Sequence, residues 1–250
     1  MTAEKDVQIL KYAVESAQKF IDNNLPLDQN IDEKVEKLIQ KILIQRSPYN
    51  IVGEECGEIS KGSALTWVID PIDGTRNMLR GIPFSAVSIA LLHKKDAMIG
   101  CVANLATKDV YFARRGFGSW LNGKRISVSG NTLLGESVVF QCHGKSMQDK
   151  ITFSRVNFDL CTRTTTRKIG STALALCYVA DGRADAFISS GDRLWDYAAG
   201  LLIVEEAKGR ISDWSGQLLE AGRSDILASN RLLHSECLDI TSKHHGNILP

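Results

Sequence analysis

The sequence predicts an α+β fold, organised as one large domain or as two packed halves. Three observations indicate this: two amphipathic helical segments open the chain, a run of strand-like segments follows them, and helices then alternate with strands. The chain has 250 residues, of which 44% are hydrophobic, a composition typical of globular proteins with a sizeable core.

Two helices are expected at the start of the chain. Between residues 4 and 22 apolar side chains recur every three or four positions, which predicts an amphipathic helix. A second helix is expected from about Asp32, with Asn30 or Asp28 as its cap. An acid at this position is most simply explained as a complement to the helix dipole.

The segment from Thr66 onward brings two aspartates to the end of a strand. Residues 66–69 favour a β-strand, and Asp70 and Asp73 follow at a spacing of three. Pro71 is expected to end the strand, because proline fixes φ and lacks an N–H donor. A buried aspartate is costly unless it is paired or binds a cation. Two carboxylates followed by a Gly74–Thr75 turn, whose N–H groups could hold an anion, therefore indicate a metal-dependent phosphate site.

A meander of strands is predicted after this turn, because alternating apolar runs are separated by short polar turns. Its expected strands are residues 86–92, 97–103 and 109–113. Residues 116–123 are interpreted as a turn that presents Trp120.

Small and polar residues at 129–135 suggest a boundary, which gives an N-terminal half, 1–130, and a C-terminal half, 131–250. The second half is predicted to contain strands at 137–140, 184–188, 210–214 and 225–229 and helices at 169–180, 195–207 and from residue 230. The polar stretch 141–168 ends in a basic group made of Arg155, Arg163, Arg167 and Lys168. Such a group is usually a solvated face, and the alternative is that it lines the approach of an anionic substrate.

Charge and cysteine content narrow the classes of function. The formal net charge is +1, which argues against nucleic acid and membrane surfaces as partners. No apolar run approaches 18 residues and no signal-peptide core is present, so a cytoplasmic protein is expected. The 6 scattered cysteines are expected to be free thiols, and zinc is not expected.

Three motifs carry a resemblance to a known family. Asp70-Pro71-Ile72-Asp73-Gly74-Thr75 resembles the first signature of the inositol monophosphatase family, the Mg²⁺-dependent, lithium-sensitive phosphatases whose superfamily includes fructose-1,6-bisphosphatase. Trp195-Asp196-Tyr197-Ala198-Ala199-Gly200 resembles its second signature, and Gly53-Glu54-Glu55 the acidic pair that precedes the first. The resemblance implies a layered α-β-α-β-α sandwich with the site between the halves.

The resemblance also implies a role for particular residues. The implied metal ligands are Glu54, Asp70, the backbone carbonyl of Ile72, Asp73 and Asp196. The implied catalytic residues are Asp32, Thr75 and Glu54, of which Asp32 and Thr75 orient the attacking water. The implied substrate-binding residues are Asp73, Gly74, Thr75, Gly170, Ser171, Ser189 and Asp196. Without the family pattern, Asp196 would be interpreted as a helix-start acid and Glu54 as part of a solvated loop.

The expected reaction is hydrolysis of a small phosphate monoester, such as an inositol monophosphate, by water that two Mg²⁺ ions activate. Two or three Mg²⁺ ions are expected, with Li⁺ or Ca²⁺ as inhibitors and a homodimer as the assembly. The connection 23–30 is shorter than in the family, and Gln29 stands where the family has a threonine, so a third ion and lithium sensitivity stay open.

The substrate also stays open. Inositol-preferring members carry a glutamate seven residues before the second-signature aspartate, where this chain has Ser189. Selectivity based on hydrogen bonds to hydroxyl groups is sensitive to such a change. Fructose 1,6-bisphosphate, histidinol phosphate and 3′-phosphoadenosine 5′-phosphate are therefore alternative substrates. A regulatory RNA- or protein-binding relative with little turnover is the alternative of another class.

Overall fold

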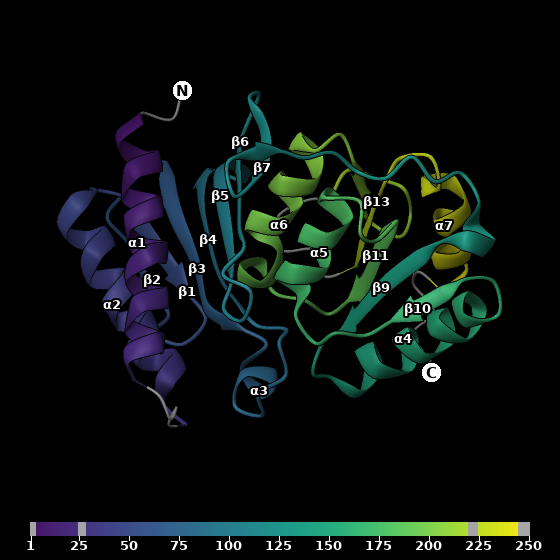
Figure 1. Cartoon of the computed structure of the whole chain (residues 1–250), viewed down its shortest axis with the longest axis horizontal. Helices are drawn as coiled ribbons and strands as arrows, with labels where there is room; N and C mark the ends of the chain where they lie inside the picture. The colour runs from purple at the N-terminus through teal and green to yellow at the C-terminus, as the bar shows by residue number, and fades with distance from the viewer. Residues whose placement is uncertain (1–3, 25–28, 220–224, 245–250) are drawn as a thin grey trace.

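The computed structural model describes residues 4–24, 29–219 and 225–244. Five layers follow one another across the molecule (Figure 1): helices α1 and α2, an eight-stranded sheet, helices α5 and α6, a five-stranded sheet, and helices α4 and α7. This arrangement confirms the expected layered α+β sandwich. The division at residues 130/131 stays a prediction, because the central core contains residues from both halves.

The helices are α1 (Glu4–Asn23), α2 (Ile31–Arg46), α3 (Thr75–Met78), α4 (Met147–Cys161), α5 (Thr172–Ala180), α6 (Leu194–Glu206) and α7 (His234–Thr241). The first sheet contains β1 (Asn50–Gly53), β2 (Glu58–Ile59), β3 (Leu65–Asp73), β4 (Ala86–His93), β5 (Asp96–Asn104), β6 (Val110–Arg114), β7 (Gly118–Leu121) and β8 (Lys124–Arg125), in the order β2-β1-β3-β4-β5-β6-β7-β8. The second sheet contains β9 (Val138–His143), β10 (Thr165–Arg167), β11 (Ala186–Ser190), β12 (Arg210–Ser212) and β13 (Ile226–Ser229), in the order β10-β9-β11-β13-β12.

Strand β3 does not end at Pro71, so that prediction was wrong. The strand continues to Asp73, with a shift of register between Asp70, which pairs with Ser88, and Asp73, which pairs with Ala86. Between these two pairs, Pro71 and Ile72 of β3 lie opposite the single residue Val87 of β4, which is a β-bulge. Proline is tolerated there because its missing N–H donor falls where the ladder is already interrupted.

Further elements differ from the sequence-based expectation, among them strand β10 and the start of α5 at Thr172 instead of residue 169. Residues 118–121 form strand β7 rather than only a turn, since Trp120 pairs with Phe112 of β6. Residues 147–161, which carry few buried apolar side chains, form helix α4 with Ser146 as its cap. Asn30 occupies the cap position of α2 without a side-chain hydrogen bond. Residues 25–28 of the connection, which include the other expected cap, Asp28, lie outside the described residues.

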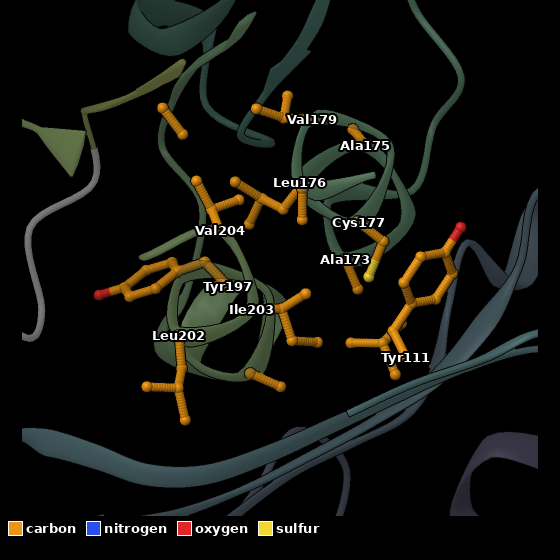
Figure 2. Close-up of a cluster of buried hydrophobic side chains, with 14 of the residues drawn as sticks. Tyr111, Ala173, Ala175, Leu176, Cys177, Val179, Tyr197, Leu202, Ile203 and Val204 are labelled. Atoms are coloured by element: carbon orange, nitrogen blue, oxygen red, sulfur yellow. The ribbon is translucent and has the colours of Figure 1, made fainter. Parts of the chain in front are cut away.

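The central layer packs closely because small residues separate its elements. Figure 2 shows the buried side chains of α5 and α6, among them Leu176 and Ile203, next to Tyr111 of the first sheet. A Cβ atom added at Gly100 would lie 3.0 Å from Cα of Ala199, and one at Gly200 would lie 2.7 Å from Cδ1 of Leu176. Helix α6 therefore approaches strand β5 and helix α5 closely, and this fixes where its first turn lies.

The second sheet and α7 enclose a buried histidine. His234 is fully buried, its Nε2 lies 3.0 Å from Ser212 Oγ and its Nδ1 lies 2.8 Å from Ser229 Oγ. Burial, with a smaller effect of Arg210, lowers the pKa of His234 to about 4. The folded state therefore holds the neutral ring, while the unfolded chain binds a proton at a higher pH.

We expect His234 to make stability depend on pH. Because its folded pKa is depressed, its contribution is present above the unfolded pKa and is lost as pH falls from about 6.5 to about 4. Substitution His234→Gln should therefore cost less unfolding free energy at pH 5 than at pH 7.5, by about 1–2 kcal/mol. Urea denaturation of both proteins with a chelator present measures this difference. Equal costs at the two pH values would contradict the assignment.

No described helix is both long enough and apolar enough to cross a membrane.

Candidate active site

The bulge in β3 fixes the conformation of Asp70. This side chain is 1% exposed, and its Oδ1 accepts a hydrogen bond from the N–H of Ile72 at 3.0 Å. Its Oδ2 is buried, and no group among the described residues donates to it. A carboxylate oxygen in that state is costly unless a proton or a cation occupies it.

Two other carboxylates meet Asp70 from distant parts of the chain. Glu54 follows strand β1, and Asp196 lies in the first turn of α6, where its Oδ2 accepts the N–H of Arg193 at 2.6 Å. One oxygen of each of Glu54, Asp70 and Asp196 lies within 4.8 Å of the others. The structure therefore brings three of the four acids expected to bind metal into one cluster.

The fourth acid, Asp73, borders this cluster and is held by α5. Its Oδ2 accepts hydrogen bonds from Ser171 Oγ and from the N–H of Ala173, both at 2.6 Å. Its other carboxylate oxygen is not engaged in these bonds. Asp73 lines the same cleft as Glu54 and Asp196, so it is available as a ligand of a second ion beside the first.

Burial, together with repulsion between carboxylates, raises the pKa values of these acids. The pKa of Asp70 is raised well above its ordinary value, that of Asp73 to about 8, and those of Glu54 and Asp196 to about 7. Burial is the largest cause in each case, and the charge of a neighbouring carboxylate is the next. At neutral pH the cluster therefore requires protons or cations.

The donor set fits a hard divalent cation. Mg²⁺ prefers oxygen ligands and retains several waters, so three or four carboxylates are sufficient. The described residues offer no histidine or cysteine within the cluster, which disfavours zinc. The unpartnered Oδ2 of Asp70 is the most specific sign, because a cation would satisfy it directly.

A hydroxyl–carboxylate pair lies directly after the two β3 aspartates. Thr75 Oγ1 is 2.6 Å from Asp32 Oδ1 and 3.0 Å from the carbonyl oxygen of Ile72. Asp32 is 9% exposed, and burial is the largest cause of its raised pKa. The threonine hydroxyl can donate to Asp32 while its oxygen accepts a hydrogen bond from a third group, as a water-orienting dyad requires.

Gly74 is required by its surroundings as well as by its backbone angle. Its φ is +87°, and a Cβ atom there would lie 2.5 Å from the carbonyl oxygen of Phe84. Gly81 also has a positive φ, +68°, but open space surrounds it. The two glycines therefore separate the cost of the backbone angle from that of the collision.

We expect Gly74→Ala to destabilise the fold by about 2 kcal/mol more than Gly81→Ala, because only the former drives a methyl group into backbone. Urea denaturation of both variants measures this. The same variant should also lower any activity of the site, because Gly74 immediately precedes Thr75. Equal destabilisation by the two substitutions would contradict this account of the turn.

Two positioning residues were missed by sequence reasoning. Glu36, one helical turn after Asp32, is fully buried, and its carboxylate accepts the N–H groups of Glu55 at 2.8 Å and Cys56 at 3.0 Å. It thereby holds the turn that carries Glu54. Asn77 donates to the carbonyl oxygens of Phe84 and Ile169, which ties the α3 turn to the loop before α5. The four-residue spacing from Asp32 to Glu36 was the available signal.

The expected substrate contacts of the second half stay a prediction, and the structure shows where their side chains lie. Ser171 is 2% exposed and caps α5 while it donates to Asp73, so its hydroxyl supports an acid instead of facing the cleft. Ser189 is 1% exposed within β11 and does not line the cleft. Gly170 lies behind the Gly74 turn, next to Asn77. The basic group at 155–168 contributes no lining side chain, although Lys168 contacts His143, which does line the cleft.

The cleft has a volume of about 480 Å³ and opens between the two halves of the chain. Glu54, Glu55 and Asp73 line it from the first half. Lys145, Arg193 and Asp196 line it from the second. Its size and its convergent charged groups suit a small anionic ligand.

Comparison with known proteins agrees with this geometry. The model of the inositol monophosphatase family matches residues 10–246. The chain belongs to the inositol monophosphatase family. One family relative is "Putative Nus factor SuhB" of Neisseria meningitidis, 39% identical, with 86% of this chain and 84% of the relative covered. Another is "Fructose-1,6-bisphosphatase/inositol-1-monophosphatase" of Thermotoga maritima, 35% identical, with 85% and 81% covered.

Solved structures of the family share the fold. The structure of inositol monophosphatase from Anabaena superposes with a TM-score of 0.88 at 26% identity and covers 94% of each chain. The names of these relatives include phosphatases and a Nus factor, so membership in the inositol monophosphatase family leaves the activity of this chain to be argued from its site.

Proposed function

We propose that the protein is a Mg²⁺-dependent phosphatase that hydrolyses a small phosphate monoester. The observation that carries this proposal is the meeting of Glu54, Asp70 and Asp196, with a buried Asp70 oxygen that no described group satisfies. These buried carboxylates repel one another, and a protein that used the fold only as a scaffold would gain nothing from that repulsion. Phosphatase names among the relatives support the same reading.

Glu54, Asp70 and Asp196 would hold the first Mg²⁺, with the Ile72 carbonyl as a further ligand, and Asp73 would contribute to a second ion. When bound, Mg²⁺ supplies the positive charge that acidifies the attacking water and stabilises the leaving oxygen. Glu36, through the N–H groups of Glu55 and Cys56, keeps Glu54 in place for this role.

Thr75 and Asp32 orient the water and accept its proton. The Thr75 hydroxyl donates to Asp32, so its oxygen accepts from the water, and the proton can pass on to the Asp32 carboxylate. The water oxygen forms the new P–O bond while the bond from phosphorus to the substrate oxygen breaks. The leaving alkoxide takes a proton from a water molecule of the open cleft, and Asp32 returns its proton to solvent. Inorganic phosphate remains, held by the N–H groups of Gly74 and Thr75. No covalent enzyme intermediate is needed.

A panel of esters tests the proposal. Phosphate release from inositol 1-phosphate, fructose 1,6-bisphosphate, histidinol phosphate and 3′-phosphoadenosine 5′-phosphate is measured with Mg²⁺ and with a chelator. We expect Mg²⁺-dependent turnover of at least one ester. Absence of turnover with all of them, in protein shown to be folded and to bind Mg²⁺, would overturn the proposal. The expected homodimer, lithium or calcium inhibition and cytoplasmic location remain predictions.

A second candidate is a regulatory binding function with little turnover. The name "Putative Nus factor SuhB" of a relative at 39% identity supports this candidate. The net charge of +1 gives no general attraction to nucleic acid, so such a role would depend on protein contacts. Salt-dependent RNA binding without hydrolysis of any ester would favour an RNA-binding role instead.

A further inference from the structure

Two cations border the acidic cluster on the wall that the second half contributes. Lys145 lies in the loop between β9 and α4; its side chain is 97% exposed and its Nζ is 3.8 Å from Glu54 Oε1. Arg193 precedes α6; its N–H donates to Asp196 Oδ2, and its side chain is exposed. Both line the cleft that contains Glu54, Asp73 and Asp196. Each cation is therefore placed beside one of the acids of the cluster.

Neither cation has a carboxylate partner other than the acids of the cluster, which would be neutralised when the cluster holds metal. No carboxylate oxygen of a described residue lies within ion-pair distance of the Arg193 guanidinium, and Lys145 has only the long contact to Glu54. Two Mg²⁺ ions would offset the four charges of Glu54, Asp70, Asp73 and Asp196. Lys145 and Arg193 would then present uncompensated positive charge to the cleft.

Among the described residues, none of the other acids that line the cleft forms an ion pair with Lys145 or Arg193. Asp149 accepts the N–H of Ser146 in the capping box of α4, and Asp192 is buried beside the hydroxyl of Thr172. Glu55 is exposed, its carboxylate forms no ion pair with a described residue, and its backbone N–H donates to Glu36. The cleft wall of the second half therefore offers two exposed cations whose natural complement is an anion on the ligand.

We propose that Lys145 and Arg193 select phosphate monoesters that carry a second anionic group, a carboxylate or a further phosphate, close to the phosphate that is hydrolysed. This inference rests on the proposed phosphatase function and names its substrate class. The metal cluster and the Gly74–Thr75 turn bind the phosphate that is removed, and the two cations bind the second anion on the alcohol side. An alcohol with hydroxyl groups alone leaves both cations without a partner.

Matched pairs of substrates test the proposal. Glycerol 2-phosphate and 2-phosphoglycerate differ only by a hydroxymethyl group against a carboxylate. Fructose 1-phosphate and fructose 1,6-bisphosphate differ by a second phosphate. We expect kcat/KM to be at least about tenfold higher for the anionic member of at least one pair, equivalent to about 1.4 kcal/mol, and the pair that responds identifies the anion. The preference should shrink in 0.5 M NaCl, because exposed charges are screened.

Variants assign the preference to these residues. In the double variant Lys145→Met, Arg193→Met the ratio of kcat/KM values should fall to near one, and Lys145→Arg should retain most of it. Arg163→Met removes an exposed cation that does not line the cleft and should leave the ratio unchanged.

Three results would overturn the inference. One is a wild-type ratio near or below one in both pairs. Another is a ratio that survives the double substitution. The third is an equal loss of kcat/KM for both members of a pair in the double variant. That result would mean that the two cations bind the phosphate being hydrolysed. Each of these three results can be observed only if the protein hydrolyses an ester. They are therefore distinguishable from failure of the phosphatase proposal, in which no ester is hydrolysed and this inference also fails.

Discussion

Asp70→Asn is expected to abolish Mg²⁺-dependent hydrolysis while it stabilises the metal-free protein. The substitution removes a ligand charge, and the loss of several kcal/mol of metal stabilisation lowers kcat/KM by about 10³-fold or more. It also removes a buried charge that Asp73, Glu54 and Asp196 repel. Phosphate release and thermal unfolding with a chelator measure the two effects.

The sign of the stability effect follows from the raised pKa values. An acid whose folded pKa is raised binds its proton more tightly in the folded state, so the metal-free protein loses stability as pH rises from about 4 to about 8. Asp70→Asn should therefore raise the Tm most at pH 8 and least at pH 5. Near wild-type turnover, or a lower Tm at pH 8 without metal, would remove Asp70 from its assigned role.

Thr75→Val is expected to lower kcat by about 10²–10⁴-fold, because it removes the hydroxyl that links the water to Asp32. Affinity for Mg²⁺ should change little, since Thr75 supplies no ligand carboxylate. Steady-state kinetics at saturating Mg²⁺ separate kcat from KM. Thr107→Val is the matched control, because the Thr107 hydroxyl also bonds a carboxylate, that of Asp109, in an exposed turn. A kcat for Thr75→Val equal to that of this control would exclude the dyad.

The sequence predicted the parts of the site that lie on well-patterned elements. Asp70 comes directly after the hydrophobic run of strand β3, and Asp196 lies in the first turn of a hydrophobic helix. Their positions therefore followed from the hydrophobic pattern and the order of the elements. Their convergence followed from the family resemblance, since no local pattern relates residues so far apart in the chain. The α+β layers were predictable for the same reason.

Other features depend on tertiary packing and had no such signal. The bulge that carries Pro71 is defined by the pairing of β3 with β4, and strand β7 is short and begins at a glycine. Helix α4 buries only Val156 and Leu160, so its apolar period is weak, although Ser146 and Asp149 carried a capping-box pattern. The buried state of Glu36 depends on the backbone of a turn 19 residues away.

The most direct test of the account is calorimetric titration of Mg²⁺ into the metal-free protein in two buffers of different ionisation enthalpy. Because the pKa values of Glu54 and Asp73 are raised to about 7 and about 8, binding at pH 7 should release protons and tighten as pH rises. Asp196→Asn should weaken binding by about 100-fold or more, and Glu205→Gln, an exposed acid on the same helix, should not. Proton-coupled binding that depends on Asp196 is the predicted result. Absence of Mg²⁺ binding, or binding of equal strength in Asp196→Asn, would contradict the shared metal site.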